Sequence, residues 1–151
     1  MHIAAQAYSP ETALQTRSFT RDWIAEGGRA YVDRYALDPV RAIRLVADAG
    51  GATVLAHPRA GRDWLVSDEQ IAGLAAVGLA GVEVFHPDHP YSERAALLAL
   101  SHDLHLLASG GSDDHGDLTG HRIGSEVAAA DVYDALLAAA GSNVLLIRGS
   151  G

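Results

Sequence analysis

Short apolar runs alternate with helix-like segments along most of this chain, and this alternation restricts the possible folds more than any other feature. The runs at 53–56, 81–85 and 104–108 are bounded by turn and capping residues, and a fourth run at 143–147 is predicted to be a final strand. Parallel strands separated by helices are joined by right-handed crossovers. The sequence therefore predicts an α/β fold in which parallel strands alternate with helices.

The helices are predicted from the residues that begin and end them. Asp38 can cap a helix that starts at the next residue, a proline, and continues to residue 49. Ser67 and Gln70 form a capping box for a helix that reaches about residue 77. Further helices are predicted at 17–26, 91–103 and 131–140.

Composition narrows the class of protein. The chain has 151 residues, 48% of them hydrophobic, which predicts a single domain spanning 1–151 with a sizeable core. The 11 basic and 19 acidic residues give a net charge of −8, which argues against binding to long nucleic acids but not against a small anionic substrate. The chain contains no cysteine and no long apolar span, so we expect a cytoplasmic protein without a membrane segment.

Polar side chains follow each of the first three predicted strands. His57 follows the first strand, His86 follows the second, and Asp113 and His115 come soon after the third. A single histidine is most often a surface or structural residue. Functional groups of parallel α/β folds gather at the carboxyl ends of their strands, so three such loops in a row predict one shared polar site.

The residue types at these positions suit a divalent metal ion. Neutral imidazole and carboxylate bind Zn²⁺, Mn²⁺ or Fe²⁺. In an extended segment, Asp113 and His115 would point to the same side and grip one centre, whereas Asp114 would point away and act as a cap or lie in solvent. His57 is the expected third ligand, and a bound metal would make hydroxide available at neutral pH. Neither a G-x-S-x-G nucleophile elbow nor a P-loop is present.

The segments 54–58 (VLAHP), 81–86 (GVEVFH) and 111–116 (GSDDHG) together resemble the PHP family, named for polymerase and histidinol phosphatase. The resemblance covers roughly residues 17–140. It is strongest to the stand-alone metal-dependent phosphoesterases that hydrolyse nucleoside bisphosphates and short RNA ends. It implies the C-terminal portion of a distorted seven-stranded β/α barrel with a cluster of two or three metal ions.

The resemblance also implies roles for individual residues. His57, Asp113 and His115 match metal ligands of the family motifs and are the expected catalytic set. The expected substrate-binding residues are His86, Arg59 and Arg62. The two arginines could instead lie in a solvated loop. Glu83 could face the barrel interior or be an ordinary carboxylate on the strand surface.

The resemblance is incomplete at the start of the chain. Family members begin with a strand that carries H-x-H, and the only histidine before His57 is His2. Either the chain is a fragment, or it closes a half-barrel against another copy as a homo-oligomer. The principal hypothesis is therefore a phosphoesterase acting on small phosphorylated substrates by metal-activated water. The alternatives are a catalytically incomplete metal-binding or assembly module and a structural remnant with solvated histidines.

Overall fold

The computed structural model describes residues 18–33, 35–61, 65–120 and 122–141. The chain divides into two compact units, one formed by residues 1–36 and 113–123 and the other by 37–112 and 124–151. Each unit is described by itself. The expectation of one domain over residues 1–151 stays a prediction.

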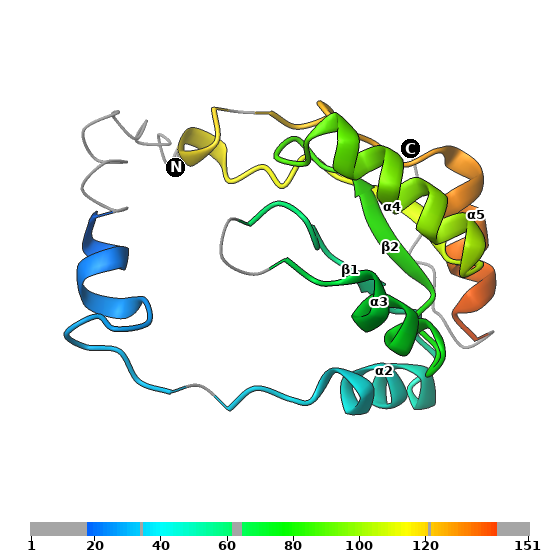
Figure 1. Cartoon of the computed structure of the whole chain (residues 1–151), viewed down its shortest axis with the longest axis horizontal. Coiled ribbons are helices and arrows are strands. Elements are labelled where there is room, and N and C mark those ends of the chain that lie inside the picture. The colour runs from blue at the N-terminus through cyan, green and yellow to red at the C-terminus, as the bar shows by residue number, and fades with distance from the viewer. Residues whose placement is uncertain (1–17, 34, 62–64, 121, 142–151) are drawn as a thin grey trace, which may run out of the picture. The chain divides into compact units, whose positions relative to one another are not determined.

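In the described part of the larger unit, three parallel strands form a sheet (Figure 1). Its strands are β1 (Val54–Leu55), β2 (Gly81–Phe85) and β3 (Leu107–Gly110), in the order β1-β2-β3. Both strand pairs are parallel, and the β2–β3 register shifts by one residue between Glu83 and Phe85. The predicted α/β class is confirmed, and the predicted strand at 143–147 lies outside the described residues.

Among the described residues, helices precede, connect and follow these strands, and capping side chains explain where two of the helices begin. Asp38 accepts a hydrogen bond from the Arg41 backbone at the start of α2 (Pro39–Asp48), and Ser67 and Gln70 form a complete capping box before α3 (Asp68–Ala75). Helix α4 packs on β2 and β3, and helix α5 packs on β3. The bounds of these two helices are Tyr91–Asp103 and Ala130–Ala139.

The third strand begins later than predicted. Residues 104–106 form the turn that ends α4, in which His105 adopts a left-handed conformation with φ 56°. The His105 and Leu106 backbone amides donate to the His102 and Ser101 carbonyls, which closes the helix with a Schellman-type pair of hydrogen bonds. The strand can therefore start only at Leu107, and the prediction of a strand over 104–108 is wrong at its first three residues.

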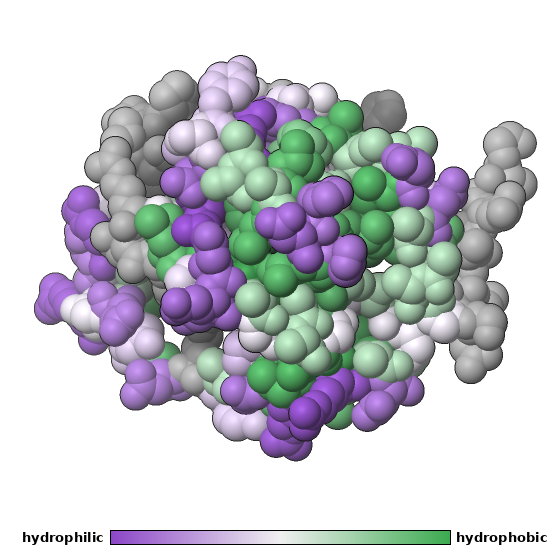
Figure 2. All heavy atoms as spheres, turned by 45° about the vertical axis from the view of Figure 1, so that its right-hand side comes forward, coloured by the Kyte–Doolittle hydropathy of each residue, from purple (hydrophilic) through white to green (hydrophobic). Residues whose placement is uncertain are grey.

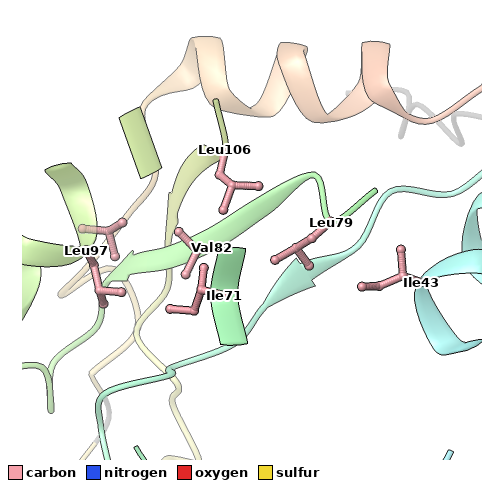
Figure 3. Close-up of a cluster of buried hydrophobic side chains, with 7 residues drawn as sticks. Ile43, Ile71, Leu79, Val82, Leu97 and Leu106 are labelled. Atoms are coloured by element: carbon pink, nitrogen blue, oxygen red, sulfur yellow. The ribbon is translucent and has the colours of Figure 1, made fainter. Parts of the chain in front are cut away.

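The core of the larger unit lies between the sheet and its helices (Figure 3). Ile71 of α3, Val82 and Val84 of β2, and Leu97 of α4 are almost fully removed from solvent. Val82 and Val84 face this core while Glu83 between them does not, which follows from the alternation of side chains along a strand. Burial of these side chains fixes β2 at the centre of the unit.

Within the residues that the structure describes, the smaller unit contains turns and two short helical segments. The segment η1 (Thr20–Ile24) has π-type geometry, with the Ala25 amide donating to the Thr20 carbonyl at 2.8 Å. Phe19 stacks on Trp23, and the Arg29 guanidinium lies 4.7 Å from the Trp23 ring centre. The second segment, η2 (Gly116–Leu118), follows the Asp-x-His motif.

In the part of the chain that the structure describes, every helix is too short or too polar to cross a membrane.

Candidate functional site

The carboxyl ends of β1 and β2 bring His57 and His86 together. His57 follows β1 and His86 follows β2 directly, and their ring centres are 5.5 Å apart. The ring centre of a third histidine, His89, is 5.2 Å from that of His86. His86 and His89 are buried, whereas His57 is exposed. The predicted clustering of polar groups at this edge of the sheet therefore holds for the loops after β1 and β2.

Glu83 lies among the site residues rather than being an unconnected surface carboxylate. Its Oε2 accepts a hydrogen bond of 2.7 Å from the His57 backbone amide. Its Oε1 lies close to Gly111, since a Cβ atom placed on Gly111 would be only 3.0 Å from this oxygen. Glu83 therefore links the loop after β1 to the loop after β3. The sequence offered one indication of this role, a charged residue between two buried valines.

Arg59 is held in place and does not lie in a solvated loop. Its guanidinium pairs with Asp68 at the start of α3, and its Nε lies 3.9 Å from a Glu93 carboxylate oxygen. Only 15% of the side chain is exposed. Among the described residues, no acceptor is within hydrogen-bonding distance of the buried Nε. Arg59 thus keeps one donor for an anionic oxygen, while two carboxylates balance its charge. Arg62 lies outside the described residues.

Arg94 of α4 fixes the loop after β2, a role that the sequence motifs did not reveal. Its Nη2 donates to the His86 carbonyl at 2.7 Å, and its Nε donates to the His89 carbonyl at 3.0 Å. The same guanidinium pairs with Glu126 at 2.8 Å and lies over the Tyr91 ring. One side chain therefore holds both ends of the His86–His89 turn.

Asp113 and His115 lie in the smaller unit and approach each other through a turn. The His115 Nδ1 donates to the Asp113 carbonyl oxygen at 2.9 Å and lies 3.9 Å from its carboxylate. Asp113 has φ 45°, so the expected extended conformation of this segment is wrong. The two side chains are still neighbours, because the turn replaces the alternation of a strand.

Asp114 and Thr119 hold this turn closed. Asp114 Oδ1 accepts hydrogen bonds from the Gly116 amide at 2.9 Å and from the Thr119 hydroxyl at 2.7 Å. The Thr119 oxygen in turn accepts a bond from the His115 amide at 2.7 Å. The predicted capping role of Asp114 is therefore correct, and Thr119 is an additional residue that positions His115.

Asp113 and His115 provide two of the donors that a metal site needs. Because the His115 Nδ1 donates to a carbonyl oxygen, its Nε2 is the nitrogen available as a ligand, the usual arrangement for metal-binding histidines. Within the described residues, however, no group of three or more His, Asp or Glu side chains is arranged to hold a metal ion. His57 belongs to the larger unit. The donors thus fit part of a metal site.

Comparison with known proteins shows which proteins the chain is similar to. The chain is 35% identical over 114 residues to the phosphoribosyl 1,2-cyclic phosphate 1,2-diphosphodiesterase of Eggerthella lenta, covering 76% of this chain and 42% of that protein. A crystal structure from Bifidobacterium adolescentis, described as a metal-dependent phosphoesterase, matches with a TM-score of 0.73 and 30% identity. The chain is therefore similar to part of a diphosphodiesterase and to part of a metal-dependent phosphoesterase.

The extent of these matches is limited. The Bifidobacterium match covers 85% of this chain and 45% of that structure, so the chain spans less than half the length of the relatives it matches. An amidohydrolase from Chromobacterium violaceum, 24% identical with a TM-score of 0.62, shares the fold over 82% of this chain and 44% of its own. No protein-family model matches the chain. These neighbours agree with the expected partial β/α architecture.

Proposed function

We propose that the chain is part of a metal-dependent phosphoesterase that hydrolyses small phosphorylated substrates, such as nucleoside phosphates or the ends of oligonucleotides. The similarity to a curated diphosphodiesterase over three quarters of the chain is the observation that carries this proposal. The polar loops after the parallel strands support it, because phosphate chemistry needs several donors at one edge of the sheet.

The metal ligands of the proposed site are His57, Asp113 and His115. A divalent ion such as Mn²⁺, Zn²⁺ or Fe²⁺ would supply activated water and charge stabilisation. The side chains contribute binding and orientation: Asp113 and His115 are held by the Asp114–Thr119 turn, and Glu83 holds the backbone of His57. The proposed substrate-binding residues are His86, Arg59 and Arg62.

A second candidate is a metal-binding or assembly module without catalytic activity. The close approach of Asp113 and His115, with 3.9 Å between the carboxylate and Nδ1, favours it, because two neighbouring donors can hold a metal ion weakly. Such a module would bind metal through a small number of ligands and hydrolyse nothing. Metal binding without turnover distinguishes it from the phosphoesterase.

Further partners follow from charge and topology. The net charge of −8 disfavours long nucleic acids, so the proposed ligand is a small phosphorylated molecule. Strands β1 and β3 each pair with β2 alone within the described residues, and open sheet edges favour association with a second copy. The proposed location is the cytoplasm, which suits a chain without cysteine.

The test combines metal content with turnover. The chain is purified without chelator, its metal is measured by elemental analysis, and phosphate release is followed with Mn²⁺ from a nucleoside 3′,5′-bisphosphate and from 5-phosphoribosyl 1,2-cyclic phosphate. We expect bound metal and hydrolysis of at least one substrate, both lost in the Asp113→Ala/His115→Ala double variant.

The controls separate the two candidates. Metal binding that the double variant abolishes, with no turnover of either substrate, would support the assembly module. Absence of metal from the intact chain, together with absence of turnover, would contradict both. An exposed histidine of α4, His102, provides the matched control as His102→Ala, which should leave metal content unchanged.

A further inference from the structure

His89, the last residue of the His86–His89 turn, forms hydrogen bonds to backbone groups through both of its ring nitrogens. His89 is 3% exposed. Its Nδ1 lies 3.0 Å from the Val84 carbonyl oxygen, which can only accept, so Nδ1 carries the proton. Its Nε2 lies 3.2 Å from the Arg59 backbone amide, which can only donate, so Nε2 presents a lone pair. His89 is therefore a neutral Nδ1–H tautomer that joins β2 to the loop after β1.

His86 is held in the opposite tautomer. The Asp88 backbone amide donates to the His86 Nδ1 at 3.1 Å, so this nitrogen carries no proton. The proton of the neutral ring is then on Nε2, which makes that atom a hydrogen-bond donor and not a metal ligand. Two rings whose centres are 5.2 Å apart thus differ in the nitrogen that carries hydrogen.

The surrounding contacts hold the backbone of the turn that carries both rings. Arg94 binds the His86 and His89 carbonyls, and the His89 amide donates to the His86 carbonyl at 3.1 Å. Arg94 is itself paired with Glu126. The backbone of the turn is therefore fixed by several hydrogen bonds, and each ring is oriented by its own hydrogen bonds to the backbone.

We propose that His89 is a positioning residue that sets the backbone of Arg59. The proposal rests on the phosphoesterase function for its substrate. The hydrogen bond from the Arg59 amide to His89 fixes the backbone of Arg59, and Asp68 and Glu93 orient its guanidinium. His89 connects β2 to the phosphate-binding loop without contacting the phosphate.

The tautomers can be measured without any activity. A two-bond ¹H–¹⁵N correlation spectrum of the ¹⁵N-labelled chain near neutral pH distinguishes the two ring forms. We expect His89 as the Nδ1–H form and His86 as the Nε2–H form. The same tautomer on both rings, or an averaged signal for His89, would overturn the assignment whether or not the chain is an enzyme.

Two substitutions separate the two hydrogen bonds of His89. In His89→Asn the side-chain amide can reach the position of Nδ1 and still donate to Val84, but the acceptor for Arg59 is lost. In His89→Gln the side-chain oxygen can reach the position of Nε2 and accept from Arg59. We expect hydrogen exchange of the Arg59 amide to accelerate on the order of tenfold in the Asn variant, as for the loss of one hydrogen bond, and to stay near wild type in the Gln variant.

Steady-state kinetics should rank the two His89 variants in the same order as hydrogen exchange of the Arg59 amide. KM for the phosphorylated substrate should rise in His89→Asn more than kcat falls, with His89→Gln closer to wild type and the exposed His102→Gln unchanged. Equal effects of Asn and Gln on Arg59 exchange and on KM would overturn the positioning role. An inactive wild-type chain in which Arg59 exchange still separates the two variants would leave the positioning role supported and count against the phosphoesterase function.

Discussion

His57 and Asp113, two of the proposed ligands, have backbone conformations that side chains rarely adopt. Their φ angles are 28° and 45°. A non-glycine residue with positive φ costs about 1–3 kcal/mol and persists only where its surroundings hold it. Glu83 accepts from the His57 amide, and the His115 ring and Arg122 both donate to the Asp113 carbonyl. This strain is held by neighbours that serve the site, which agrees with a functional role for both residues.

The first prediction concerns the bond between Glu83 and His57. In Glu83→Ala the His57 amide loses its acceptor, which should lower the free energy of unfolding by about 1–3 kcal/mol. Glu83→Gln retains an oxygen in place and should cost less. Urea unfolding followed by circular dichroism measures both variants. A Gln variant as unstable as the Ala variant would show that the negative charge matters and not the acceptor.

The second prediction compares the two adjacent aspartates. Asp113→Asn removes the charge of a proposed metal ligand and should weaken Mn²⁺ binding roughly a hundredfold, the upper end of the range for residues that only support a ligand. Asp114→Asn keeps the oxygen that accepts from Gly116 and Thr119, so its affinity should stay near wild type. Titration calorimetry at fixed pH measures both. Equal losses would contradict the separate roles of the two carboxylates.

At the scale of elements, local chemistry predicted most of the fold. Strand β2 and helix α4 agree with the sequence to the residue. Helices α2 and α3 begin at the residues that their caps indicate. The error at β3 arose because a left-handed His105 ends α4 and no residue type in that position signals it, since glycine is usual there. Apolar runs mark the presence of strands more reliably than their first residues.

The third prediction tests the close contact between β2 and β3. A Cβ at Gly81 would lie 2.7 Å from the Leu107 carbonyl oxygen, so Gly81→Ala should push the strands apart and cost about 1–3 kcal/mol. Gly73 in α3 is the matched control, because a Cβ there meets nothing within 4 Å. Gly73→Ala should stabilise by about 0.5–1 kcal/mol. Thermal unfolding should show a lower midpoint temperature for Gly81→Ala and a higher one for Gly73→Ala. A lower midpoint for both variants would refute the packing argument.

At the scale of the whole molecule, the sequence indicated which loops carry chemistry but not how each side chain is used. The His86–His89 turn shows why: residue types cannot reveal that one histidine bridges two backbone groups while its neighbour carries its proton on the other nitrogen. Nor could they reveal the Arg94 contacts, because arginine in a helix is usually a solvated residue. Hydrogen-bond geometry set by tertiary contacts decided both roles.

The last prediction concerns association between copies of the chain. Within the described residues, β1 and β3 each leave one edge without a neighbouring strand, and large hydrophobic side chains are exposed on α4 and α5, Leu98 at 46% and Tyr133 at 59%. Figure 2 shows broad hydrophobic areas between hydrophilic side chains. Open edges and apolar surface favour self-association, whereas the net charge of −8 opposes it.

These opposing effects make association depend on salt. Added NaCl screens the repulsion between copies and leaves apolar contact intact, so the average mass should rise with both protein concentration and ionic strength. Sedimentation velocity over a concentration series at low and high salt measures this. A mass that falls with salt would mean that ion pairs hold the copies together. A single monomeric species throughout would mean that the sheet edges and the exposed apolar side chains do not bind a second copy.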